Sequence, residues 1–200
     1  MGLSIYLLEG CNSDQCKREI ARINKILEEE HLPTYNKPHT SQVEESDLPE
    51  IEWLYSTSEP LELLAAKFIE NPNWIIPINR QDYYPISATS HKKIIQKGQS
   101  HIVCLPKISG YYVPVYFKSL LFHRSPLLGS SIAFRDELQC LAIKLNLDLG
   151  EYTPHFGALR AEREQELEKD AFGSEKWTLL CLYNLAVASI RYGSAIVFVG

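Results

Sequence analysis

The sequence predicts an α+β fold, a single domain over residues 1–200 in which helices pack on a mostly antiparallel sheet; a mixed α/β arrangement also fits. Three observations lead to this class. The chain has 200 residues, 45% of them hydrophobic, which is enough to bury a core. Apolar runs typical of strands lie near both ends and in the middle, with segments of helical spacing between them. No repeat or Pro/Gly-rich linker divides the chain into separate units.

The first seventy residues have the pattern of two strand–helix pairs. Residues 3–8 alternate and are bulky, which predicts a half-buried strand, and apolar positions at helical spacing predict an amphipathic helix over 14–30. After a proline-containing loop, 53–57 predicts a short strand. Ser58 is followed by an acid, a proline and an apolar face, which is typical of a helix start, and Asn71-Pro72 ends that helix.

The middle of the chain contains the strongest strand signal. Three prolines make 72–88 irregular, and the basic residues of 91–97 fit one or two helical turns. In 101–117, β-branched and aromatic residues flank a Pro/Gly turn at 106–110. This pattern predicts a β-hairpin.

Three helices and a strand are expected in the last third. Gly129-Ser130-Ser131 predicts a capped helix start, and the charged residues of 158–170 predict a short, exposed helix. A further helix begins at Gly173-Ser174 and is stopped by Gly193. The apolar run 195–199 predicts a central strand that is covered on both faces.

The charge of the chain is distributed unevenly. The formal net charge is −5, yet the 53 residues from Tyr83 to Arg135 contain seven Lys or Arg and no Asp or Glu, so the remainder carries −5 − 7 = −12. Such a block can form a cationic surface for anions, and aromatic rings between the cations can hold a base or nucleotide. Alternatively, the tyrosines belong to the core and the lysines to an ordinary solvated surface. The candidate ligand-binding residues are Lys92, Lys93, His101, Tyr111, Tyr112, His123, Arg124 and Arg135.

A complementary acidic block spans residues 44–62, where seven acidic residues meet no Lys or Arg. An acidic patch of this kind suits a basic protein partner, as when an inhibitor covers a cationic enzyme. A solvated loop followed by the first turn of a helix explains the same residues, because the helix dipole favours acids there.

Complete catalytic motifs are absent from the sequence. We find no glycine-rich nucleotide motif, no phosphate loop and no metalloprotease motif, and we expect neither a cofactor nor catalytic residues. A hydrolase could still combine His101 and His123 with Ser130 or Cys104. Alternatively, Ser130 is a helix cap and Cys104 is a buried, inert thiol.

The cysteines indicate a reducing compartment. Their number, five, is odd, and no apolar run approaches a membrane span, so we expect a cytoplasmic protein without membrane contact. Cys11 and Cys16 would need two further ligands to bind zinc, and we expect no metal site.

Four parts of the chain carry a resemblance to known sequences: Gly2–Tyr6, His101–Val103 with Gly110–Val115, Gly129–Ser131 and Ser189–Phe198. In these parts the chain resembles a family of bacterial proteins of about this length with no assigned activity. Family members carry acidic residues in the hairpin turn and after the second tyrosine, where this chain has none. If relatives use those acids for metal binding or acid–base chemistry, this chain cannot do so in the same way. The resemblance implies a single domain and no particular substrate.

Three functions from different classes fit these observations. The first is a noncatalytic interaction or inhibitor protein that neutralises a toxin or defence factor by covering it. The second is a binding module for a small anionic ligand such as a nucleotide, and the third is the hydrolase. We therefore expect a protein or a small anion as the partner, and we do not expect nucleic acid or membrane.

Overall fold

The computed structural model describes residues 2–8, 14–36, 50–121, 124, 126–152, 163, 166–167 and 169–200. Its centre is a five-stranded sheet in the order β2-β1-β5-β3-β4. Three of the four strand pairings are antiparallel, and only β3 and β4 run parallel. The predicted α+β class with a mostly antiparallel sheet is confirmed. The strands are β1 (Gly2–Leu7), β2 (Glu50–Leu54), β3 (Ser109–Val113), β4 (Leu127–Ser130) and β5 (Ile196–Val199).

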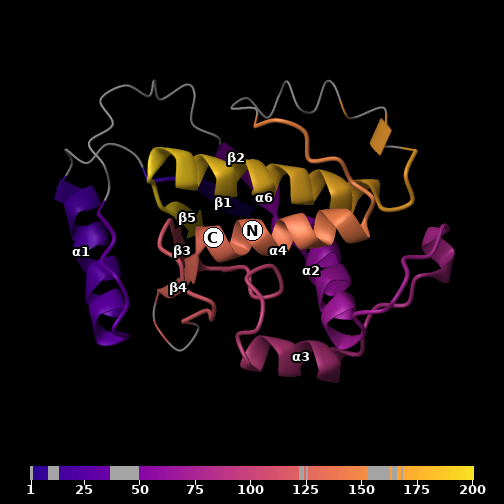
Figure 1. Ribbon diagram of the computed structural model, residues 1–200, viewed down its shortest axis with the longest axis horizontal. Coiled ribbons are helices and arrows are strands. Elements are labelled where there is room, and N and C mark those ends of the chain that lie inside the picture. The colour runs from indigo at the N-terminus through magenta and orange to yellow at the C-terminus, as the bar shows by residue number, and fades with distance from the viewer. Residues whose placement is uncertain are drawn as a thin grey trace.

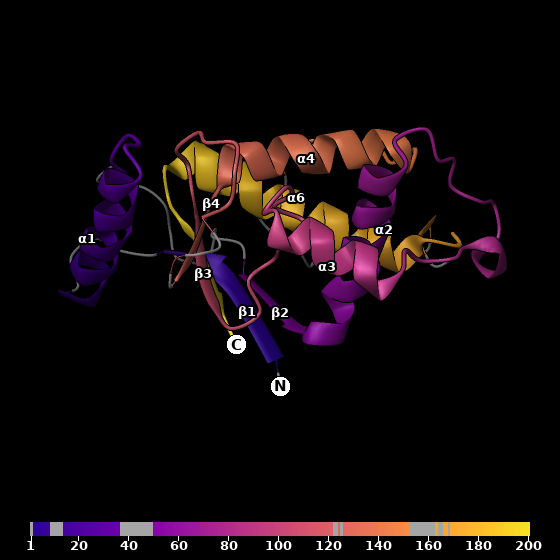
Figure 2. The same ribbon diagram turned by 90° about the horizontal axis from the view of Figure 1, so that it is seen from below.

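Helices cover both faces of this sheet, with α1 on one face and α2, α4 and α6 on the other (Figures 1 and 2). Among the described residues, no helix is both long and apolar enough to span a bilayer. The helices are α1 (Asp14–Glu29), α2 (Tyr55–Glu70), α3 (Ala88–Gln96), α4 (Ser131–Lys144) and α6 (Gly173–Tyr192), and a 3-10 turn, η2 (Arg80–Asp82), lies between α2 and α3.

Alternation along the strands divides the core into two clusters, one on each face. Tyr112, Ile196 and Phe198 point toward α2, α4 and α6, whereas Tyr111 and Val197 point toward α1. Strand β5 lies in the middle of the sheet and is buried on both faces, as its apolar sequence predicts.

Two of the predicted helix boundaries that rest on capping chemistry are confirmed. The Ser130 hydroxyl accepts from the Ala133 N–H at 3.1 Å and begins α4. Gly193 ends α6 with a φ of 60°, a left-handed conformation that glycine adopts without steric cost.

The hairpin predicted over 101–117 is wrong. Strand β3 pairs with β5 and β4, and residues 101–104 form turns. The reason is that their backbone N–H groups already have other acceptors: those of 101 and 102 donate to Glu137, and those of 103 and 104 donate to Ser100. No N–H in this segment is left for a strand ladder.

Two smaller predictions also change. The strand expected at 53–57 lies at Glu50–Leu54. Helix α2 starts at Tyr55 and not at the predicted Ser58, so that Pro60 lies inside the helix. Strand β4 was not expected. The exposed helix predicted over 158–170 lies mostly outside the described residues.

Candidate functional site

The predicted ligand-binding residues do not converge on one site. Lys92 and Lys93 are exposed on α3, whereas His101 and Tyr112 are fully buried in the core between the sheet and α4. Tyr111 is buried on the opposite face of the sheet, where its hydroxyl donates to a glutamate of α1. His123 lies outside the described residues.

Three of the seven cations in the acid-free block are matched by carboxylates from elsewhere. Lys107 contacts the buried Glu62, and Arg135 contacts the adjacent Asp136. Arg124 donates to two glutamates at the end of α1, at 2.8 Å to Glu29 and 2.5 Å to Glu30. The block therefore does not present its charges as one cationic surface.

The two candidate tyrosines, Tyr111 and Tyr112, have no ring face available to a ligand. Burial raises the pKa of the Tyr111 hydroxyl, and its hydrogen bond to Glu19 raises it further. Tyr112 packs edge-on against His101 and Phe134, with ring centroids 5.5 and 4.9 Å apart. Both rings serve the core, which is the alternative that the sequence left open.

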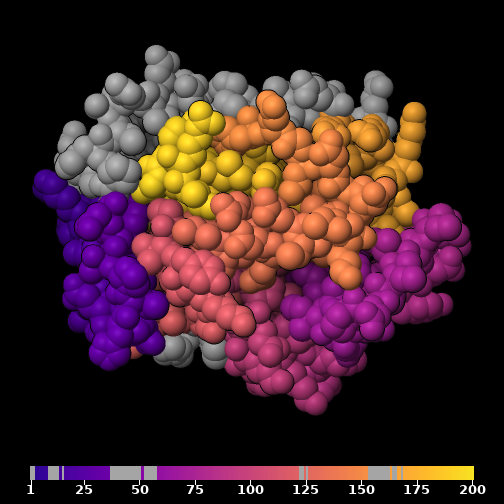
Figure 3. Space-filling model, viewed as in Figure 1, coloured from indigo at the N-terminus to yellow at the C-terminus, as the bar shows by residue number. Residues whose placement is uncertain are grey.

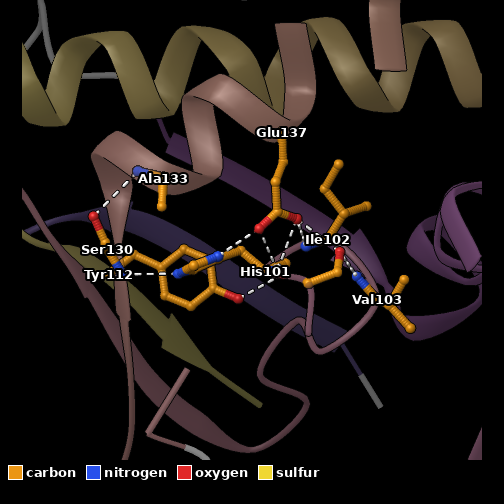
Figure 4. Close-up of polar contacts among 8 residues, drawn as sticks. His101, Ile102, Val103, Tyr112, Ser130, Ala133 and Glu137 are labelled. Carbon is orange, nitrogen blue, oxygen red and sulfur yellow. Dashed lines mark hydrogen bonds and ion pairs between the residues drawn. The ribbon is translucent and has the colours of Figure 1, made fainter. Parts of the chain in front are cut away.

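His101 is part of a buried polar network (Figure 4). Its Nδ1 lies 2.6 Å from Oε1 of Glu137, and its Nε2 lies 3.2 Å from the backbone nitrogen of Ser130. A backbone N–H can only donate, so Nε2 must be the acceptor. The ring proton is therefore on Nδ1 and is donated to Glu137.

The Glu137 carboxylate accepts three further donors from the turn that follows α3. The backbone N–H of His101 lies 3.0 and 2.9 Å from its two oxygens, and Oε2 also accepts from Ser100 Oγ at 2.7 Å and from the Ile102 N–H at 3.3 Å. The Tyr112 hydroxyl donates to the His101 carbonyl at 2.7 Å. One side chain of α4 thus fixes a buried turn against the sheet.

This geometry does not provide a nucleophile with its base. In a Ser–His arrangement the imidazole accepts the serine hydroxyl proton, but here Nε2 accepts a backbone N–H and the Ser130 hydroxyl caps α4. Burial raises the pKa of Cys104 to about 11, so its thiol is almost wholly protonated at neutral pH. Among the described residues, no group of three or more His, Cys, Asp or Glu could hold a metal ion.

A cavity of about 430 Å³ lies beside the network, between α2 and α4. Its lining is largely apolar and includes Phe68, Ile69 and Leu141, together with Glu137. The oxygens of Glu137 are already occupied by donors of the turn, and none of the predicted ligand-binding residues lines the cavity. Sequence reasoning missed Glu137, because its partners are 35 to 37 residues away and no motif marks the pairing.

The acidic block divides into a structural part and an accessible part. Glu62 is buried and contacts the Lys107 ammonium, which also donates to Ser58 at 2.9 Å, whereas Glu59 is exposed near the start of α2. Glu50 and Glu52 are positions of β2, at the edge of the sheet. The other three acids of the block lie outside the described residues.

A second concentration of acids lies where it lowers helix stability. Glu28 and Glu29 are the last residues of α1, whose last turn has no basic residue, and Glu30 follows directly. Carboxylates are unfavourable there because the helix dipole presents its negative end. Arg124, from a distant part of the chain, compensates two of them.

A family model described as "Putative DNA-mimic protein" matches residues 1–198. No curated protein and no solved structure matches the chain. The family match corrects our expectation about partners, because a DNA-mimic family points to proteins that bind DNA. The expectation that nucleic-acid recognition is not involved is therefore wrong, whereas the expectation of a protein partner is consistent with the match. The match extends nearly from end to end of the chain, which agrees with the expected resemblance to a single family of proteins of about 200 residues. The chain belongs to this DNA-mimic family.

Proposed function

We propose that this protein covers the DNA-contacting surface of a DNA-binding protein and blocks it without catalysis. The observation that carries the proposal is the family match over residues 1–198. The uneven charge supports it, since the chain outside residues 83–135 carries a formal −12.

The physical basis is that DNA-binding surfaces place Lys and Arg side chains to meet phosphates. Carboxylates can pair with the same cations and speed the encounter through long-range attraction. Within this chain the acidic block 44–62 is the best candidate, because it has seven acids and no basic residue. Glu62 does not belong to the proposed contact, since it is buried and paired with Lys107.

The buried network supports the noncatalytic part of the proposal. Both ring nitrogens of His101 are occupied, and Cys104 is a protonated, buried thiol. His101 and Cys104, two of the four groups considered for a hydrolase, therefore contribute to the folded interior.

The test is direct binding to purified DNA-binding proteins, measured by biolayer interferometry against a helix-turn-helix repressor, a minor-groove architectural protein and a DNA glycosylase. The proteins of the source cell that are retained on double-stranded DNA-cellulose form a further probe. We expect at least one of these probes to bind and to be displaced by a double-stranded oligonucleotide, because the protein and DNA would occupy the same surface.

A charge-matched pair of variants locates the contact. Glu44→Gln, Glu45→Gln and Asp47→Asn together remove three charges from the acidic block, and Asp14→Asn, Glu28→Gln and Glu29→Gln remove three from α1. We expect the first variant to weaken binding more than the second, beyond the shared effect of net charge. If no probe binds, or if saturating DNA leaves the complex intact, the proposed function is wrong.

A further inference from the structure

The segment 71–87, between α2 and α3, projects from the body of the molecule and carries large apolar side chains at its surface. It forms the right-hand edge in Figures 1 and 2, and Figure 3 shows it at the edge of the surface. Ile75, Ile78 and Tyr84 are 84%, 92% and 75% exposed. Isolated exposed apolar residues are common, but three within ten residues of a projecting segment indicate a contact surface.

The exposed side chains alternate with others that point inward. Trp74, Ile76 and Tyr83 pack against the main core. The rings of Trp74 and Tyr83 belong to an aromatic row, with centroid distances of 4.9 Å from Phe68 to Trp74, 5.8 Å from Trp74 to Tyr83 and 5.6 Å from Tyr83 to Phe172. The segment is therefore held by its own inner side chains.

An ion pair with a buried carboxylate fixes the far end of the segment. Arg80, in η2, contacts the carboxylate of Glu175, a residue of α6 that is only 2% exposed. The guanidinium carbon of Arg80 also lies 5.1 Å from the ring centroid of Tyr83 and 5.0 Å from that of Phe172. A segment held in this way loses little conformational freedom on binding, which favours affinity.

The charge of the segment complements a basic surface. The positive charge of Arg80 is matched by Glu175, whereas the carboxylate of Asp82 is exposed and accepts only from the amide of Asn79 among the hydrogen bonds of the described residues. The segment therefore presents apolar side chains beside an uncompensated negative charge. Its complement is an apolar hollow with a cation at its rim.

We infer that segment 71–87 is a second contact with the same DNA-binding protein, in which Ile75, Ile78 and Tyr84 enter an apolar hollow beside the cations that bind DNA. This inference rests on the proposed function. The apolar contact depends on shape and is insensitive to salt, whereas the contact of the acidic block is electrostatic. Together they would let the protein select one DNA-binding protein among many with similar charge.

The test uses the full-length protein and whichever probe binds it in the interferometry experiment. The variant is Ile75→Ser with Ile78→Ser. The matched control is Ile108→Ser with Ile143→Ser, which removes two isoleucines that are 76% and 79% exposed elsewhere. Circular dichroism melts should show both variants folded, because exposed positions contribute little to stability.

We expect the loop variant to bind at least about tenfold more weakly and the control to stay within about twofold of wild type. The loss should persist at high salt, where the electrostatic contribution is screened. If wild type binds a DNA-competed probe and the loop variant binds it equally well, the inference is wrong and the proposed function stands. If no probe binds wild type, both fail. If sedimentation shows a wild-type dimer that the loop variant dissolves, the segment serves self-association and the inference is overturned.

Discussion

Replacing Glu137 by glutamine tests the central role of the buried network with a change of almost no volume. The wild-type carboxylate accepts from Ser100, from the backbone and ring of His101, and from Ile102. An amide has a single oxygen, so it cannot accept all of these donors in either orientation.

The two orientations of the amide fail in different ways. With its nitrogen toward His101, the amide opposes the Nδ1 proton, and moving that proton to Nε2 would oppose the N–H of Ser130. With its nitrogen toward Ser100, the amide leaves the buried N–H of Ile102 without its acceptor. Each orientation therefore leaves at least one buried donor unpaired.

An unpaired buried donor costs about 1–3 kcal/mol, so Glu137→Gln should lower the free energy of unfolding by about that amount. For a chain of this size the melting temperature should fall by about 2–12 °C. The measurement is urea unfolding followed by circular dichroism, with equal slopes required for the comparison.

The neighbouring Asp136→Asn is the matched control, because it is the same isosteric change one residue earlier on α4. Asp136 is half-exposed and contacts only Arg135 among the ion pairs of the described residues, so the change should stay within about 0.5 kcal/mol. Equal stabilities of the two variants would refute the assignment of His101 and Glu137 as a fold-holding pair.

Two further predictions concern titratable side chains. Burial raises the pKa of Glu62, although the Lys107 ammonium opposes this, so the folded protein holds the Glu62 proton more tightly than the unfolded chain does. Wild type should therefore gain stability relative to Glu62→Gln as the pH falls from the raised folded pKa toward 4.5, which is the pKa without burial. The measurement is the urea midpoint of each protein across that pH window. A difference between the two midpoints that does not change with pH would contradict the prediction. Cys104, with a pKa of about 11 against an ordinary 9.0, should have about a 100-fold smaller thiolate fraction at pH 8 than an ordinary thiol, so it should react more slowly with iodoacetamide, and burial should slow it further. Timed mass spectrometry should show the exposed Cys140 alkylated first, and equal labelling of the two cysteines would show that the thiol is accessible.

Local chemistry in the sequence determines a large part of the fold. The alternation of residues 3–8, the serine cap at 130 and the glycine at 193 each set an element through neighbours within a few residues. The apolar run at the C-terminus similarly indicates burial on both faces, and it becomes the central strand. Signals of this kind survive without tertiary context because the physical cause lies in the same segment.

Contacts between distant residues decide the rest. His101–Leu105 has the composition of a strand, yet Glu137 takes the backbone donors that a strand would need, so the segment turns and β3 finds its partners elsewhere. In the same way the acid-free block reads as cationic, but Glu62, Glu29 and Glu30 come from other elements to neutralise Lys107 and Arg124. Composition and spacing determine which segments form helices and strands and how much charge those segments carry. Contacts between residues far apart in the sequence determine which hydrogen-bond donors and charges remain free. The reason is that many hydrogen bonds and ion pairs form only when distant elements meet.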